Sequence, residues 1–175
     1  LLDVIPSQNG YEATVEIINE TGHKLPSGYP EGRRMWINLV AYDDQDNIIY
    51  ESGAYDFDTA ILNTDGTKIY EAKLGMTQTM ADVANSNNNG HYNYSAGESF
   101  HFALNNTIIK DNRIPPRGFT NVNFEMVQAA PVGYTYIDGS YSDKTTYSLP
   151  SHTHEVKAKL YYQTISKEYV EFLKE

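Results

Sequence analysis

Five stretches of alternating apolar and polar residues constrain the fold of this chain more than any other feature. Successive side chains of an extended strand point to opposite faces, so a period of two collects the apolar residues on one face. That face has to be covered by another layer of structure. In the second stretch both sets of positions are largely apolar, which predicts a central strand that is buried on both sides. The stretches are residues 11–17, 35–41, 100–104, 122–126 and 156–162.

Shorter signals complete the expected architecture. Residues 48–51 and 68–72 are further strand candidates, and the polar segment 43–47 predicts a hairpin turn between two strands. Residues 166–174 carry apolar side chains at helical spacing, which predicts one short helix at the C-terminus. The long polar segments that we expect to be loops are residues 54–66, 75–96, 105–119 and 129–152.

These elements together predict a single all-β domain over residues 1–175. The expected fold is an antiparallel β-sandwich of Greek-key or immunoglobulin-like type, with long loops and a short C-terminal helix. Because the sequence begins at Leu1 rather than at Met, we expect it to be a processed chain or a module of a longer protein.

The composition argues against several classes of function. The net charge of −10 disfavours nucleic acid, which selects basic surfaces. The absence of cysteine removes disulfides, thiol catalysis and Cys-ligated metal, and it removes covalent attachment of a c-type haem, which needs a Cys-x-x-Cys-His segment. No apolar run approaches the length of a membrane-spanning helix, so we expect no membrane span.

Catalytic and metal-binding signals are sparse. The sequence has no Gly-x-Ser-x-Gly elbow, no phosphate-binding glycine loop and no His-Glu-x-x-His helix, so we expect a protein that is not an enzyme. His152 and His154 stand two apart at the start of a strand and could share a metal, or they could be exposed histidines at a strand edge. Asp138 and Asp143 flank a Gly-Ser turn and are candidate calcium ligands, or they belong to a solvated loop.

Residues 19–36 form the most closely specified segment of the chain. They contain one His, two Pro, three Gly and two adjacent Arg, which fixes the path of the backbone. His23 could offer a ring nitrogen to a partner, or its imidazole could hold its own loop together through buried hydrogen bonds. Arg33 and Arg34 begin a strand and should point to opposite faces, one toward a carboxylate at the edge of the core and one toward solvent or an anion.

Several motifs resemble those of a known family. The segment 21–36 (TGHKLPSGYPEGRRMW) is similar to a stretch of the haem-free β domains that occur beside haem-binding segments in bacterial multihaem c-type cytochromes. The resemblance covers roughly residues 10–175. The further similar segments, in the same order as in the family, are 49–53 (IYESG), 69–73 (IYEAK), 112–119 (NRIPPRGF) and 160–169 (LYYQTISKEY).

The resemblance implies a function as well as a fold. It implies a non-catalytic accessory domain in a periplasmic or extracellular electron-transfer protein, which packs against a haem-bearing cytochrome domain or subunit. This chain would bind no haem covalently, and the haem c would belong to the neighbouring domain or partner. His23 could approach that haem as a distal axial ligand, with Lys24, Arg33 and Arg34 as further candidates for contact with the haem or the partner.

A second interpretation belongs to a different class. The tyrosine-rich segments 91–94 and 134–136 could stack on sugars, as aromatic rings do, which would make the chain a surface-binding module for carbohydrate. A fibre or assembly subunit that associates with itself is the other form of this alternative. Ordinary packing at a sheet edge is the competing explanation for both tyrosine-rich segments.

Overall fold

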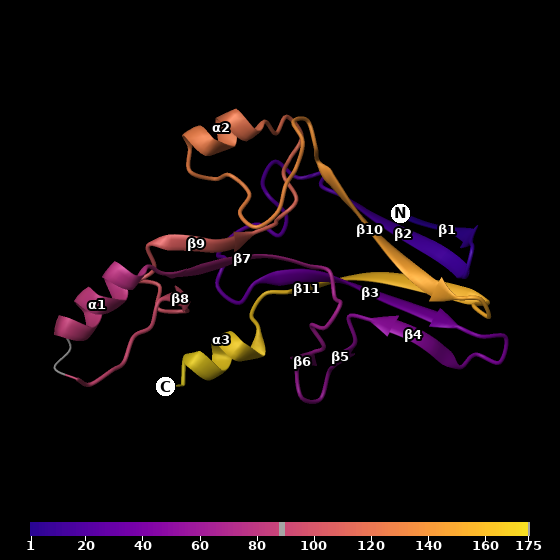
Figure 1. Cartoon of the computed structure of the whole chain (residues 1–175), viewed down its shortest axis with the longest axis horizontal. Helices are drawn as coiled ribbons and strands as arrows, with labels where there is room; N and C mark the ends of the chain where they lie inside the picture. The colour runs from indigo at the N-terminus through magenta and orange to yellow at the C-terminus, as the bar shows by residue number, and fades with distance from the viewer. Residues whose placement is uncertain (88–89, 175) are drawn as a thin grey trace.

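The computed structural model, which describes residues 1–87 and 90–174, consists mainly of two antiparallel sheets (Figure 1). One sheet has three strands in the order β1-β2-β10: β1 (Leu2–Ser7), β2 (Gly10–Ile18) and β10 (Ser142–Pro150). The other has six strands: β3 (Arg34–Tyr42), β4 (Ile48–Ser52), β7 (Ile69–Met76), β8 (Gly97–Glu98), β9 (Thr107–Asp111) and β11 (Glu155–Gln163). The antiparallel β-sandwich predicted from the sequence is confirmed.

The six-stranded sheet is organised around β3. β11 pairs with β3 along its whole length, from Arg34 opposite Gln163 to Tyr42 opposite Glu155. β4 and β7 share the other edge of β3, and β8 and β9 pair with β7. The remaining elements are short: β5 (Tyr55–Asp56), β6 (Ile61–Leu62), α1 (Gln78–Asn87), α2 (Asn121–Met126) and α3 (Lys167–Phe172).

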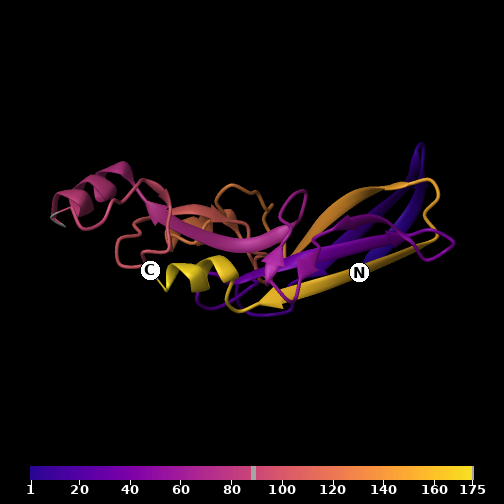
Figure 2. The ribbon, with the colours of Figure 1, turned by 90° about the horizontal axis from the view of Figure 1, so that it is seen from below.

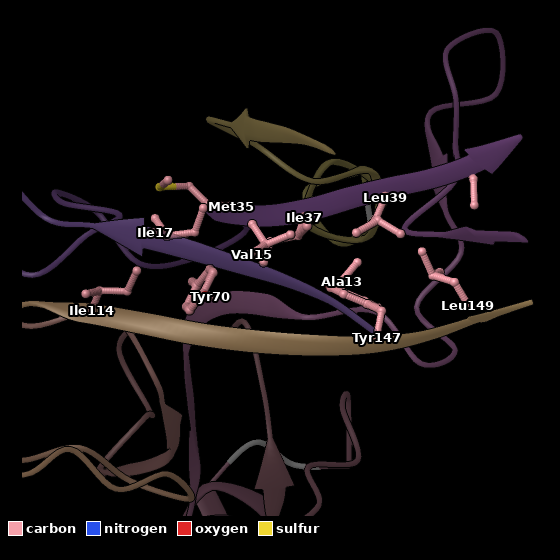
Figure 3. Packing of buried hydrophobic residues seen from close by; sticks show 11 residues of the cluster. Ala13, Val15, Ile17, Met35, Ile37, Leu39, Tyr70, Ile114, Tyr147 and Leu149 are labelled. Atoms are coloured by element: carbon pink, nitrogen blue, oxygen red, sulfur yellow. The ribbon is translucent and has the colours of Figure 1, made fainter. Parts of the chain in front are cut away.

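The core lies between β2 and β3 and is closed by β10. Alternate side chains of β2 and β3 point toward one another (Figure 3), as the period-two pattern requires. The opposite face of β3 is also covered, because Trp36 stacks on Tyr161 and contacts Tyr55. The prediction that β3 is buried on both faces is therefore confirmed. The main cluster comprises Ala13, Val15, Ile17, Met35, Ile37, Leu39, Ala41, Tyr70, Ile114, Tyr147 and Leu149.

Two further local predictions are confirmed. The segment 43–47 forms the hairpin between β3 and β4, where the Asp43 carboxylate accepts hydrogen bonds from the backbone amides of Gln45 and Asn47. The C-terminal helix forms as α3, and the Ser166 side chain caps it by accepting from the Tyr169 amide.

Two predicted strands are wrong. Residues 122–126 form α2, which begins after Thr120, whose side chain accepts a hydrogen bond from the Asn123 amide. Val122 and Met126 are four residues apart, a spacing that fits a helix face as well as alternate strand positions. Residues 100–104 form turns, in which the Leu104 amide donates to the His101 carbonyl.

Segments expected to be loops contain regular structure. The segment 129–152 includes β10, 105–119 includes β9 and 75–96 includes α1, and β1 lies outside the predicted strands. β10 lacks a strong apolar period because two of its inward positions are polar, Asp143 and Thr145. Tertiary contacts compensate for the burial of Asp143, as described below.

The molecule is elongated. Figures 1 and 2 show α1 and α3 at one end and the β1–β2 hairpin at the other, with β7 running out of the sandwich toward the helical end. Within residues 1–87 and 90–174, no helix is long and apolar enough to cross a membrane.

Candidate functional site

The loop between β2 and β3 is held by a buried asparagine. Asn19 is fully buried, and its amide nitrogen donates to the carbonyls of His23 at 2.7 Å and Ile114 at 2.9 Å. Its amide oxygen accepts from the backbone amide and the hydroxyl of Thr21. Leu25 then pairs with Ile114 through two backbone hydrogen bonds of 2.9 Å. These contacts fix the backbone on both sides of His23.

The imidazole of His23 is exposed at the tip of this fixed loop. Only its backbone is used: the carbonyl accepts from Asn19 and from the Thr21 hydroxyl. Across the part of the chain that the structure describes, the ring makes no hydrogen bond and no ion pair. The interpretation of His23 as a residue whose imidazole holds the loop is therefore wrong, because Asn19 has that role.

The two alternatives predict different effects of mutation on stability. Replacing Asn19 with Ala is expected to lower the free energy of unfolding by about 2–3 kcal/mol, because the buried Ile114 carbonyl and the partly buried His23 carbonyl each lose a donor. Replacing His23 with Ala should change it by less than about 0.5 kcal/mol, since the side chain is exposed. Urea unfolding of the two variants measures both values. A large loss for His23→Ala would contradict this assignment.

Lys24 points inward, although the sequence made it a candidate for partner contact. Its ammonium lies 2.7 Å from an Asp111 carboxylate oxygen, and both side chains are more than nine-tenths buried. Arg113 binds the same carboxylate through its Nε at 2.9 Å and its Nη2 at 2.7 Å. Lys24 is thus committed to a buried ion-pair cluster and is removed from the contact candidates.

The cluster shifts the protonation of both partners. Burial lowers the pKa of Lys24, and the contact with Asp111 offsets part of that shift. Burial alone would raise the pKa of Asp111, but the hydrogen bonds and charges of Arg113 and Lys24 outweigh it, so the net shift of the pKa is downward.

We therefore expect Asp111 to contribute to the loss of folding stability at low pH. A carboxyl whose folded pKa is depressed stabilises the fold above its unfolded pKa of about 3.9, and this contribution is lost as the pH falls through the lower folded value. The stability difference between the natural protein and Asp111→Asn should be constant above about pH 5 and should shrink below about pH 4. Thermal unfolding between pH 2.5 and 7 measures it. A difference that grows on acidification would contradict the assignment.

Arg33 and Arg34 occupy different environments. Arg34 is buried, and its Nε donates to Gln163 at 2.8 Å while its Nη1 lies 3.5 Å from the Glu168 carboxylate. Arg33 donates from Nη1 to the Ser27 carbonyl at 2.6 Å. Arg34 therefore links β3 to β11 and α3, and Arg33 stabilises the loop.

A polar pocket of about 360 Å³ lies where the end of this loop meets β7 and α3. Gly32, with φ of +69°, allows the close approach, because a Cβ there would lie 2.7 Å from the Cβ of Tyr169. Glu31 and Arg34 line the pocket beside Glu71, Lys73 and Lys110. Sequence reasoning did not single out Glu31, whose only local signal is its place between Pro and Gly.

The candidate metal ligands are not brought together with others of their kind. Asp143 accepts from the hydroxyls of Tyr70 and Tyr134 and pairs with Lys68 at 2.8 Å, so it belongs to the core. Asp138 accepts from the Asn121 amide. Among the described residues, no group of three or more His, Asp or Glu is placed to hold a metal, and this covers the exposed His152 and His154.

The tyrosines proposed for sugar stacking are divided. Tyr136 is buried and donates to the Asn112 carbonyl at 2.9 Å, and the Tyr134 ring is covered by Lys68 at 3.9 Å. The prediction that segment 134–136 stacks on sugars is therefore wrong. Tyr92 is 64 % exposed and lies 5.9 Å from the Tyr94 ring, so of the two tyrosine-rich segments 91–94 is the one that keeps an exposed aromatic side chain.

Comparison with known proteins gives one kind of match. No protein-family model and no curated protein matches the chain. Among solved structures, a penta-heme cytochrome c552 from Thermochromatium tepidum is similar, with a TM-score of 0.54 and 17 % identity. The alignment covers 99 % of this chain but only 34 % of that cytochrome, so this chain spans about a third of its length. At this identity the match establishes the likeness of fold alone.

Proposed function

We propose that this chain is a non-catalytic accessory domain of an extracytoplasmic multihaem c-type cytochrome, where it packs against haem-bearing modules or neighbouring subunits. The observation that chiefly supports this function is the exposed imidazole of His23 on a rigid loop. Imidazole is a common axial ligand of haem iron, and a fixed backbone reduces the entropy lost on binding.

The surroundings of His23 support a protein interface. The Lys24 ammonium lies 5.8 Å from the centre of the Phe124 ring, so the loop is adjacent to α2. Around α2 four large apolar side chains are at least 65 % exposed, which is typical of a surface that a partner covers. They are Val122, Met126, Val127 and Ile137.

The comparison supports the same proposal. The similar solved structure is a cytochrome with several haems, and this chain corresponds to about a third of its length. A haem-free β domain of this kind would work beside haem modules carried on the same gene product or on a partner. We place it in the periplasm or outside the cell because c-type cytochromes work there. Self-association remains a prediction that the structure does not test.

The proposal is tested on the complete gene product or on its complex with a haem protein. His23→Ala should alter the visible spectrum and midpoint potential of one haem and leave the unfolding of the β domain unchanged. The matched control is the double variant His152→Ala/His154→Ala, which removes two other exposed imidazoles and should leave the haems unaffected.

A separate measurement decides the accessory role itself. A tagged form of the chain should capture a haem-staining protein from periplasmic or secreted fractions of its host, and Met126→Asp should weaken that capture by placing a charge in the apolar surface of α2. The proposal fails if the gene encodes no Cys-x-x-Cys-His segment and no haem protein is captured.

A further inference from the structure

The pocket beside the loop contains charged groups that lack partners. Glu31 is 5 % exposed, yet neither of its carboxylate oxygens accepts a hydrogen bond from any described residue. Arg34 is 6 % exposed, and its Nη2 likewise has no acceptor among those residues. Both residues line the pocket. Buried polar atoms are normally paired, so two such groups in one pocket indicate a ligand.

The lysines of the pocket are paired with its other carboxylates. Lys110 lies 2.9 Å from Glu71, and Lys73 lies 3.0 Å from Glu98. The hydrogen bond with Tyr169, burial and then the charge of Glu31 raise the pKa of Tyr29. Glu31 is therefore close to Tyr29, but its carboxylate oxygens accept no hydrogen bond from it. Arg33 donates from Nη1 to the Ser27 carbonyl, but its Nε also lacks an acceptor among the described residues. The Glu31 carboxylate, Nη2 of Arg34 and Nε of Arg33 are therefore the groups free to bind.

The lining is also balanced in charge. Four cationic and four anionic side chains surround the pocket, which disfavours a ligand of high net charge. A ligand should therefore donate a hydrogen bond to the Glu31 carboxylate and accept one from the Arg34 guanidinium. The charged residues of the lining are Arg33, Arg34, Lys73 and Lys110, with Glu31, Glu71, Glu98 and Glu168.

We infer that this pocket binds a small zwitterion of the α-amino-acid class, with its ammonium on Glu31 and its carboxylate on Arg34. An ammonium brings three donors and one positive charge to a carboxylate that has neither, and a carboxylate accepts from guanidinium nitrogens. The ligand is neutral overall, as the balanced lining requires, and the volume of the pocket exceeds that of one amino acid.

Other ligand classes fit less well. A sugar usually stacks on an open aromatic face, but Phe100, which is the aromatic residue of the lining, already packs against Tyr169 and Phe172 at 5.1 and 5.7 Å. A metal ion would need several ligating groups together, and the described residues contain no such cluster. An anion alone would meet Glu31, and a cation alone would meet Arg34.

Three matched probes test the inference by amide chemical-shift titration and isothermal calorimetry on the full chain. L-glutamine carries both charged groups, 4-aminobutanamide lacks the carboxylate, and glutaramate lacks the ammonium. We expect L-glutamine to shift the backbone amides of Glu31 and Gly32 in a saturable way. Each probe that lacks one charged group should bind about tenfold more weakly or worse.

Variants connect binding to the named groups. Glu31→Gln keeps the shape of the side chain and should weaken L-glutamine binding at least about tenfold without lowering the melting temperature, since no intramolecular hydrogen bond is lost. Glu20→Gln, whose exposed carboxylate pairs with Arg117 on the surface, is the control and should bind normally. If Glu31→Gln does not fold, Glu31→Asp replaces it, because the shorter side chain keeps the charge and withdraws it from the ligand.

Three results would overturn the inference. The first is no saturable shift with L-glutamine at 20 mM. The second is equal affinity for L-glutamine and 4-aminobutanamide, which would indicate a site for a cationic side chain of a protein partner. The third is unchanged binding in the Glu31 variant. None of these depends on a cytochrome partner, so failure here is distinguishable from failure of the proposed accessory role.

Discussion

Replacing Asp111 with Ala is expected to lower the free energy of unfolding by about 3–5 kcal/mol. The change leaves the Lys24 ammonium buried without its carboxylate and also removes the acceptor of Arg113. For a chain of this size the melting temperature should fall by roughly 6–20 °C. Denaturant unfolding and calorimetry measure the two quantities.

Two comparisons separate the buried charge from other effects of the substitution. Lys24→Met removes the ammonium and keeps the aliphatic volume, so its cost should be smaller, because Asp111 still pairs with Arg113. Glu20→Ala breaks an ion pair with Arg117 that is exposed on both sides, and it should leave the melting temperature unchanged. Similar losses for Asp111→Ala and Glu20→Ala would show that burial does not govern this cluster.

Replacing Asp143 with Ala is expected to have an effect of similar size, about 3–5 kcal/mol. Its carboxylate accepts from Tyr70 at 2.9 Å and Tyr134 at 2.7 Å, and it neutralises the largely buried Lys68 at 2.8 Å. The substitution leaves all three groups without their partner at the junction of β7 and β10. Thermal and urea unfolding measure the loss.

The network predicts a graded series. Tyr70→Phe removes one hydroxyl and leaves Asp143 with two partners, so it should cost about 1 kcal/mol. Glu155→Ala, in the exposed pair with Lys157, should have no measurable effect on the melting temperature. If Asp143→Ala is no worse than Tyr70→Phe, the ion pair with Lys68 is not part of the network's stability.

Three of the five period-two stretches form the strands that their pattern predicts. β2 and β3 carry period-two apolar positions, and their burial follows from strand geometry. β11 forms as its pattern predicts, but Leu160 and Tyr162 stay exposed. The β3–β4 hairpin follows from its run of Asp and Asn, and the C-terminal helix from its apolar spacing. α2 was mistaken for a strand because its apolar residues satisfy both periods, and only Thr120 as an N-cap marks the helix.

For the loop ahead of β3, the sequence determined that the backbone follows one closely specified path, because Gly and Pro restrict φ. It could not decide which side chains turn inward. Lys24 is buried because Asp111, 87 residues further along the chain, lies beside it, and His23 is exposed because Asn19 already holds the loop.

The same distinction applies to the rest of the candidate site. The sequence offered Asp143 as a calcium ligand or a solvated loop residue and did not single out Glu31, since a buried polar residue has no local signature. Its burial is tolerable only when distant segments supply a partner, or when a ligand does. The periodic apolar pattern therefore determined the sandwich. The tertiary structure decided which charged groups are paired inside it and which side chains, such as those of His23 and Glu31, remain available to bind.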